Sequence, residues 1–472
     1  MIPNFLTAFT NAFKIQELRK RIFFTLVIVV ITRIGAAIPV PGVDANALRR
    51  FFETQQETQG SGFLTLLNIF SGGALEQMAI FSLTIMPYIS ASIIFQLLTA
   101  VIPQLSKIVR EEGGRQKITQ YTRIATIFIA LFQSFIFARA FENPKNLPMF
   151  SSLPEDVILV PDVGPVLLNL FITKITLFDF TTVVTLTGGT ILMMWLGEQI
   201  TERGIGNGIS MLIATNILAR FPAAVGMAFQ MFFPAPGIER EYHIIHAALF
   251  IAMFLAVIAA VIVVTQAQRK ITVQYAQRMV GRKMFGGGQT YMPLKVNYSG
   301  VMPVIFASAI LMFPKMIFGF VNIDIEWLKW LNRIDGWLNE RGWVHMTAYA
   351  VMIFFFSYFW VATVFNPIQI ADDLKKHGGY VPGVRPGKPT ADFLADTMER
   401  ITFAGAIFLV VVALIPQMLY ARIPPLTANF FGGTSLLIVV GVLLDTLRQI
   451  ETHLITHNYE GFLKKGRMKG RI

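Results

Sequence analysis

The sequence has no cysteine and unusually few charged residues for its length. Charged side chains make up 14% of the 472 residues, and hydrophobic residues account for 54%. The absence of thiols excludes disulfides, thiolate metal sites and cysteine-based catalysis. A soluble domain carries about 25% charged residues. Most of this chain is therefore expected to lie away from water.

The sequence also lacks the motifs of nucleotide binding and of catalysis within a membrane. Gly387-Lys388 is followed by Pro389, so it lacks the spacing of a phosphate-binding loop. No Asp pair, His-Glu-x-x-His motif or Ser and His pair falls inside an apolar run. We therefore expect no enzyme activity, no cofactor, no metal site and no small-molecule substrate. A substrate-specific secondary transporter remains the alternative, although it would need charged residues at bilayer depth.

Long apolar runs dominate what is present. A helix needs about 20 apolar residues to cross the hydrocarbon core. Ten runs approach that length, and the third and fourth are expected to extend into their flanks. Their approximate bounds are 22–40, 77–101, 124–138, 180–196, 209–229, 246–264, 301–320, 346–365, 401–420 and 432–447. No Ala-x-Ala-type cleavage site closes the first run, so we expect it to remain a membrane span.

The basic residues indicate an orientation. The net charge is +12, and most of the 40 Lys and Arg residues fall in the termini and in alternate loops. Positively charged loops stay in the cytoplasm. Both basic termini then lie on the cytoplasmic side, which requires an even number of spans and is consistent with ten.

One apolar segment, about residues 61–73, is too short to span. It ends with Gly72-Gly73, a flexible joint before the next helix. It could be a movable stopper inserted into a pore, or a fixed helix on the outer surface. The residues alone slightly favour the surface helix, because short amphipathic connectors are common.

Two loops, about 266–297 and 372–400, are long and basic. In the first, Ile271, Val273 and Tyr275 alternate with polar residues and predict a β-hairpin with a triglycine turn. In the second, prolines and glycines frame Arg385. The basic residues of these loops have two equally good explanations. They could only anchor the loops in the cytoplasm, or they could dock to a large anionic partner.

Several segments resemble the SecY family of protein translocases (SecY/Sec61-alpha), over a match that runs from about Glu17 to Gly470. These segments are FSGGAL at 70–75, IMPYISASII at 85–94, WLGEQITERGIGNGIS at 195–210, PLKVN at 293–297, VPGVRPG at 381–387 and FGGTSLLIVV at 431–440. The resemblance implies an all-α membrane protein with ten transmembrane helices in two pseudo-symmetric, inverted five-helix halves and a short re-entrant plug helix. The halves would be residues 1–235 and 236–472. Met-Pro-x-Ile recurs at 86–89 and 302–305, which hints at that internal symmetry.

The resemblance also implies residue roles. The six isoleucines of a pore ring would be Ile85, Ile89, Ile209, Ile213, Ile305 and Ile438. The plug would include Phe63, Leu64, Leu67, Asn68, Phe70, Gly72 and Gly73, which favours the stopper over the surface helix. Gln96 and Asn297 would tune a lateral gate by pairing across apolar helices. The docking residues for a motor or ribosome would be Arg269, Lys270, Arg282, Lys283 and Arg385.

As a family member the protein would be a channel for unfolded polypeptides in the bacterial inner (plasma) membrane, with both termini cytoplasmic. The implied partners are SecE, SecG, the SecA motor ATPase, the ribosome, signal peptides, nascent chains and membrane lipids. The outer loop at 142–179 has no role that the sequence indicates.

Overall fold

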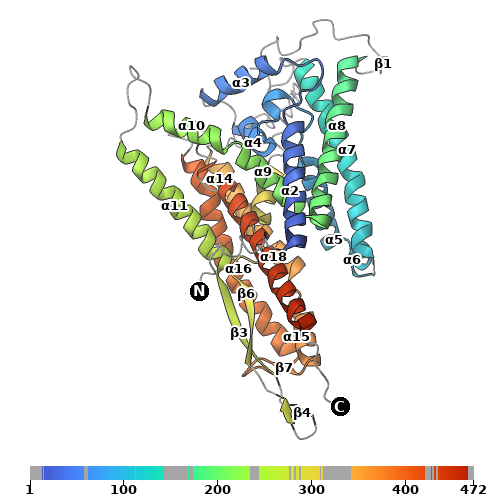
Figure 1. Ribbon diagram of the computed structural model, residues 1–472, viewed down its shortest axis with the longest axis vertical. Helices are drawn as coiled ribbons and strands as arrows, with labels where there is room; N and C mark the ends of the chain where they lie inside the picture. The colour runs from blue at the N-terminus through green and yellow to red at the C-terminus, as the bar shows by residue number, and fades with distance from the viewer. Residues whose placement is uncertain are drawn as a thin grey trace, which may run out of the picture.

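The computed structural model describes residues 13, 15–57, 62–111, 113–142, 168–169, 174–233, 244–275, 278–280, 283–285, 289–308, 310–311, 342–419, 427, 430–431 and 434–465. Within these ranges the chain is mostly helical. Long helices run roughly side by side, and a small β-sheet projects at one end (Figure 1).

The helices come from both halves of the chain. Those before residue 235 are α2 (Gln16–Gly35), α3 (Ala45–Glu57), α4 (Gly62–Ser71), the 3₁₀ turn η1 (Leu75–Gln77), α5 (Met86–Val101), α6 (Pro103–Arg110), α7 (Gly114–Glu142), α8 (Leu177–Arg203), α9 (Gly208–Ala219) and α10 (Phe221–Phe232). Those after it are α11 (Ile244–Gln266), α14 (Trp343–Val364), α15 (Pro367–Lys376), α16 (Lys388–Leu419) and α18 (Thr434–Lys465). Residues 302–308 and 310–311 are also helical.

The strands are short. They are β1 (Leu168–Asn169), β2 (Lys174–Ile175), β3 (Gln268–Tyr275), β4 (Arg278–Val280), β5 (Lys283–Phe285), β6 (Gln289–Lys295) and β7 (Gly379–Tyr380). The pair β1–β2 falls within the outer loop at 142–179, most of which lies outside the described residues.

Six helices of the described chain are long and apolar enough to cross a membrane, and a bent pair at 86–101 and 103–109 would make a seventh. The chain is thus a multi-pass membrane protein. The expected extension of the third and fourth runs is confirmed, because α7 has 29 residues and α8 has 27. Much of the seventh run lies outside the described residues, and the count of ten spans stays a prediction.

The second predicted span is wrong in its start at 77, whereas its end at Val101 is confirmed. Regular helix begins only at Met86, and Met78 and Thr84 have positive φ angles of 43° and 55° in the turns before it. The helix then ends at Val101, because Ile102 precedes Pro103 and is extended. Counting apolar residues overlooked the turns before Met86.

The fifth predicted span is confirmed as an apolar stretch long enough to cross a membrane, Gly208–Phe232, although it is divided into α9 and α10. Arg220 caps both helices and Pro222 stands in the first turn of α10. Proline is readily accommodated at the start of a helix but not inside one. The break places an arginine in the middle of an otherwise apolar segment.

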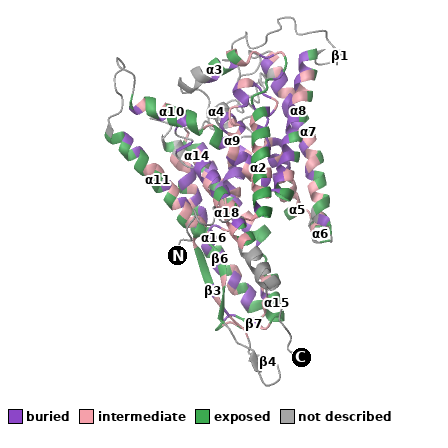
Figure 2. Ribbon diagram, viewed as in Figure 1, coloured by how far each residue is buried: buried purple, intermediate pink, exposed green. Residues whose placement is uncertain are grey.

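The outer surface of the helices is apolar. Phe23 in α2, Phe128 in α7 and Leu249 in α11 are exposed by 67%, 69% and 64%, and green exposed positions recur along these helices in Figure 2. A helix that is apolar all round belongs in a membrane or in a large core. These faces are suited to contact lipid.

The largest apolar cluster lies at the centre, where it joins α5, α8, α9, α18 and the helical residues 302–308. A separate small cluster brings Leu18 at the start of α2 against Ile205 and Ile450. The beginning of α2 and the later turns of α18 therefore lie at the same end of the molecule, as an even number of crossings requires.

The predicted β-hairpin is confirmed. β3 and β6 pair antiparallel from Gln268↔Lys295 to Gln274↔Gln289, and β7 pairs with the other edge of β3. The inner face of the hairpin carries Ile271 and Leu294, which pack with Val381 and Leu394. The two basic loops are thus joined into one body. The triglycine at 286–288 lies outside the described residues. The prediction that it forms the turn of the hairpin is wrong, because β4 and β5 lie between β3 and β6 in the chain and pair from Arg278↔Phe285 to Val280↔Lys283, so the chain reverses between Val280 and Lys283.

Candidate functional site

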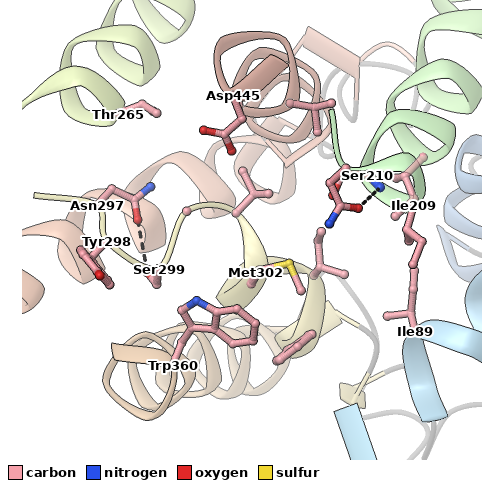
Figure 3. A pocket seen from close by; sticks show the side chains of 18 of the residues that line it. Ile89, Ile209, Ser210, Thr265, Asn297, Tyr298, Ser299, Met302, Trp360 and Asp445 are labelled. Atoms are coloured by element: carbon pink, nitrogen blue, oxygen red, sulfur yellow. Dashed lines mark hydrogen bonds between the residues drawn. The ribbon is translucent and has the colours of Figure 1, made fainter. Parts of the chain in front are cut away.

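A cavity of about 610 Å³ lies between the two halves of the chain. In Figure 3, Ile89 and Ile209 border it on one side, and Asn297, Ser299, Met302 and Trp360 border it on the other. The first two come from α5 and α9, and Trp360 comes from α14. The cavity is therefore a gap between halves rather than a pocket within one of them.

The six isoleucines assigned to the ring fall in one cluster, although they come from four separate segments. Five are buried in the central cluster and Ile209 packs against it. Four of the six line the cavity, namely Ile89, Ile209, Ile213 and Ile305. Ile85 and Ile438 are each 1% exposed. β-Branched side chains of this kind are stiff at the first side-chain torsion.

The charged lining of the cavity is confined to one end. Its charged residues are Lys295, Asp445 and Arg448, and Lys295 belongs to the hairpin strand β6. Arg448 donates through Nη2 to the carbonyl oxygen of Thr265, 3.1 Å away, at the end of α11. Burial and the nearby Arg448 lower the pKa of Lys295, while Asp445 opposes the shift. The three charged residues therefore lie near one another, beside the hairpin strand β6 and the end of α11.

The plug candidate is α4, and its last turn is buried. Asn68 and Ile69 are each 1% exposed, and Ile69 belongs to the same central cluster as the isoleucines. Phe70 packs on that cluster, and Leu67 packs on a neighbouring one. The interpretation as a surface helix is wrong for this turn. The side chains of Phe63 and Leu64 lie outside the described residues.

The diglycine after α4 needs both of its glycines. Gly72 and Gly73 have φ angles of +64° and +88°, which side-chain-bearing residues rarely adopt. A Cβ on Gly72 would lie 2.5 Å from Nη1 of Arg33 and 2.9 Å from the carbonyl oxygen of Asn216. The joint is thus tightly enclosed by α2 and α9.

The two gate candidates line the same cavity without the predicted pairing. Gln96 Nε2 donates to Ser92 Oγ at 3.1 Å, whereas the Asn297 side-chain oxygen accepts from Ser299 Oγ at 3.2 Å. No bond between the two amides is seen in the described part of the chain. Each amide bonds to a near neighbour in sequence, and the buried side-chain oxygen of Gln96 has no hydrogen-bond partner in the described residues. The predicted bridge across the gate is therefore wrong for this conformation.

The docking candidates are exposed where they can be described. Arg269 and Lys270 lie on β3, and Arg385 lies on a tip where Gly383 and Gly387 have φ angles of +84° and +100°. Arg282 lies outside the described residues, as does the side chain of Lys283. Because β3 and the 381–387 tip belong to one body, the three described cations share one end of the molecule.

Reasoning from the sequence missed the charged contacts around the diglycine. Arg33, Glu76 and Arg220 meet there from three separate segments. Glu76 and Arg220 are 144 residues apart in the chain, and their spacing carries no signal. Only the isolated charges within apolar runs could have drawn attention to them.

Comparisons with known proteins agree with this architecture. The SecY family model matches residues 79–447. The protein translocase subunit SecY of Streptomyces scabiei is 46% identical over 463 residues, which cover 97% of this chain and 100% of that one. The corresponding subunit of Thermotoga maritima is 41% identical, over 98% of this chain and 99% of its own.

Solved structures share the fold at low identity. A structure described as a protein conducting channel superposes with a TM-score of 0.57 at 16% identity, over 96% of this chain and 95% of that one. Sec61 in the canine ribosome-channel complex from the endoplasmic reticulum gives a TM-score of 0.54, also at 16% identity and with the same shares of both chains covered.

Membrane-spanning helices around a cavity, together with these relatives, identify a protein-translocation channel. The chain belongs to the SecY family, which confirms the resemblance found in its motifs.

Proposed function

We propose that this protein is a passive conduit for unfolded polypeptide, sealed by its six isoleucines and by α4. The observation that carries the proposal is the convergence of those isoleucines, from four segments, on one buried cluster beside the cavity. A narrow apolar ring excludes ions by dewetting, yet yields to a chain that pushes through it. Polypeptides are accepted whatever their sequence, because such a seal has no binding groups.

In the proposed mechanism a hydrophobic signal sequence enters from the cavity side and moves sideways into lipid. Burial of its apolar surface drives this step. The gate is the seam between α5 and α7 on one side, and the helical residues 302–308 and α14 on the other. This assignment is supported by Gln96 and Asn297, which line the cavity from opposite halves of the chain. Displacement of α4 and opening of the ring then admit the polar part of the chain.

The energy for transport comes from outside the chain, through the SecA motor or translation by the ribosome. The exposed cations Arg269, Lys270 and Arg385 form the docking surface, with Arg282 and Lys283 on the same loop. Their shared location on the hairpin body supports one surface that two alternative partners use. SecE and SecG complete the complex.

The proposed topology has ten spans in two inverted halves, residues 1–235 and 236–472, in the bacterial inner membrane. Both termini lie in the cytoplasm with the hairpin. The packing of the start of α2 on α18 supports this arrangement.

Deletion of residues Asn68 to Ala74 tests the conduit directly. The chain, reconstituted with its partner subunits in planar bilayers, is expected to pass ions without a translocating substrate once the deletion is made. The intact chain stays closed. A deletion variant that passes no more ions than the intact chain would show that α4 is not the seal.

A further inference from the structure

Two arginines enclose the joint that follows α4. Arg33 of α2 donates through Nη2 to the carbonyl oxygen of Gly72 at 3.2 Å, and through Nη1 to Asn216 Oδ1 at 3.5 Å. On the other side, a Cβ on Gly73 would lie 3.2 Å from Nη1 of Arg220. The joint therefore sits between two guanidinium groups, with the buried polar side chains of Asn68, Glu76 and Asn216 around it.

Glu76 connects this joint to its surroundings. It forms an ion pair with Arg220, in which Nη1 donates to Oε2 at 2.8 Å and Nη2 donates to Oε1. Its Oε1 also accepts from Asn68 Nδ2 at 2.6 Å. The Glu76 side chain is 9% exposed and that of Arg220 is 12% exposed. A two-pronged pair shielded from water in this way is strong and directional.

The bond from Asn68 closes a loop across the diglycine. Asn68 belongs to the last turn of α4, before the joint, whereas Glu76 lies in η1, after it. Swinging α4 about the joint breaks the bond between Asn68 and Glu76. The ion pair between Glu76 and Arg220 survives, because neither partner belongs to α4. The ion pair between Glu76 and Arg220 therefore stays in place, and the hydrogen bond from the Asn68 amide is the contact that breaks.

We propose that Glu76, held in place by Arg220, is the latch that keeps α4 closed through its hydrogen bond with Asn68. This inference rests on the proposed role of α4 as the plug. Arg220 is a positioning residue here, since its contact with α4 runs through Glu76. The rival explanation is an ion pair that only stabilises the break between α9 and α10 at Arg220.

A swap of donor and acceptor separates these explanations. Asn68→Asp replaces the amide donor with a carboxylate facing Glu76, and like charges repel. Adding Glu76→Gln returns one donor and one carboxylate in exchanged positions, with the original net charge. The side-chain oxygen of the new amide can still accept from Arg220, and its NH2 group donates to the carboxylate at position 68. A latch predicts that the first change opens α4 and that the second closes it again. If the ion pair is only structural, the double variant is expected to open α4 at least as much as Asn68→Asp alone.

Two readouts follow the plug in the full chain, reconstituted with its partner subunits. The first is ion conductance in planar bilayers without substrate. The second uses the absence of cysteine in the chain. Ile69→Cys, at a position that is 1% exposed, reports opening by its rate of reaction with a membrane-impermeant maleimide. Asn68→Asp is expected to raise both signals at least about tenfold, and the double variant to restore both.

Arg139→Gln is the matched control. Arg139 pairs with Glu142 Oε2 at 2.8 Å and Asp179 Oδ2 at 3.1 Å, between α7 and α8. It breaks a comparable ion pair away from α4 and is expected to leave both signals at the level of the unmodified chain.

The outcomes separate the latch from the conduit. If the 68–74 deletion leaks but Asn68→Asp stays closed, or if the double variant leaks as much as Asn68→Asp, the latch is wrong and the conduit stands. If the deletion itself stays closed, the role of α4 as a plug fails, and the latch fails with it.

Discussion

Gly188 and Gly189 show how much a single position in this protein depends on its neighbours. Both lie in α8, one after the other. A Cβ on Gly189 would lie 2.1 Å from the carbonyl oxygen of Ile80, whereas a Cβ on Gly188 would meet nothing within 4 Å. The turn that precedes α5 therefore approaches the backbone of α8 at one glycine and not at the other.

This contrast predicts that the same substitution destabilises the protein at Gly189 and changes its stability little at Gly188. Gly189→Ala is expected to lower the free energy of unfolding by about 1–3 kcal/mol, because two backbone segments must move apart. Gly188→Ala, its matched control, is expected to change stability by less than about 0.5 kcal/mol. Thermal unfolding of the two variants in the same detergent compares them. Equal losses would contradict the close approach.

The gate amides show where reasoning about single residues stops. The sequence placed Gln96 and Asn297 near the same opening, and both line the cavity. It also predicted that they bond to each other, but each bonds to a side chain in its own segment. A hydrogen bond depends on positions known to a few tenths of an ångström. Spacing in the sequence does not supply that precision.

At the scale of elements, the hairpin and the proline-glycine tip form one structure. β3 pairs with β6 and β7, and Ile271 packs with Val381 and Leu394 beneath them. The alternation of Ile271 and Val273 was enough to predict the hairpin, because side chains on a strand alternate between its faces. The pairing of β3 with β7 joins residues more than 100 positions apart, which no local pattern indicates.

Arg385→Glu tests this surface. Reversing the charge is expected to lower motor-driven or ribosome-driven export at least about tenfold, because an anionic partner meets repulsion at a rigid tip. Insertion and folding of the chain should not change, since Arg385 is exposed. Export in membrane vesicles measures the effect.

Lys376→Glu provides the control for that test. Its side chain is 74% exposed at the end of α15, and the reversal there is expected to change export by less than about twofold. Equal losses from the two variants would point to general electrostatics rather than to docking at the tip.

At the scale of the whole molecule, the protein has an apolar outer surface and an apolar central cluster beside the cavity. Phe128 faces outward with 69% exposure, while Ile213 is 7% exposed in the central cluster beside the cavity. Two apolar residues of similar character therefore have different expected partners, lipid for the first and passing polypeptide for the second.

A photo-reactive side chain at each position distinguishes these partners. With a polypeptide arrested during translocation, the probe at position 213 is expected to crosslink to it. The probe at position 128 is expected to crosslink to lipid or to nothing. Crosslinking at both positions, or only at 128, would place the translocation path outside the isoleucine cluster.

Composition, the length of the apolar runs and the placement of charge were sufficient to determine that this chain is a membrane protein that crosses the bilayer many times. The reason is that burying a charged side chain in lipid is costly at every position in the chain. Motifs determined the family. The tertiary structure alone decided which polar and charged side chains meet. It brings Glu76, Arg220, Asn68 and Arg33 together around one joint. The reason is physical, since an ion pair depends on distance in space, and packing of helices far apart in the chain sets that distance.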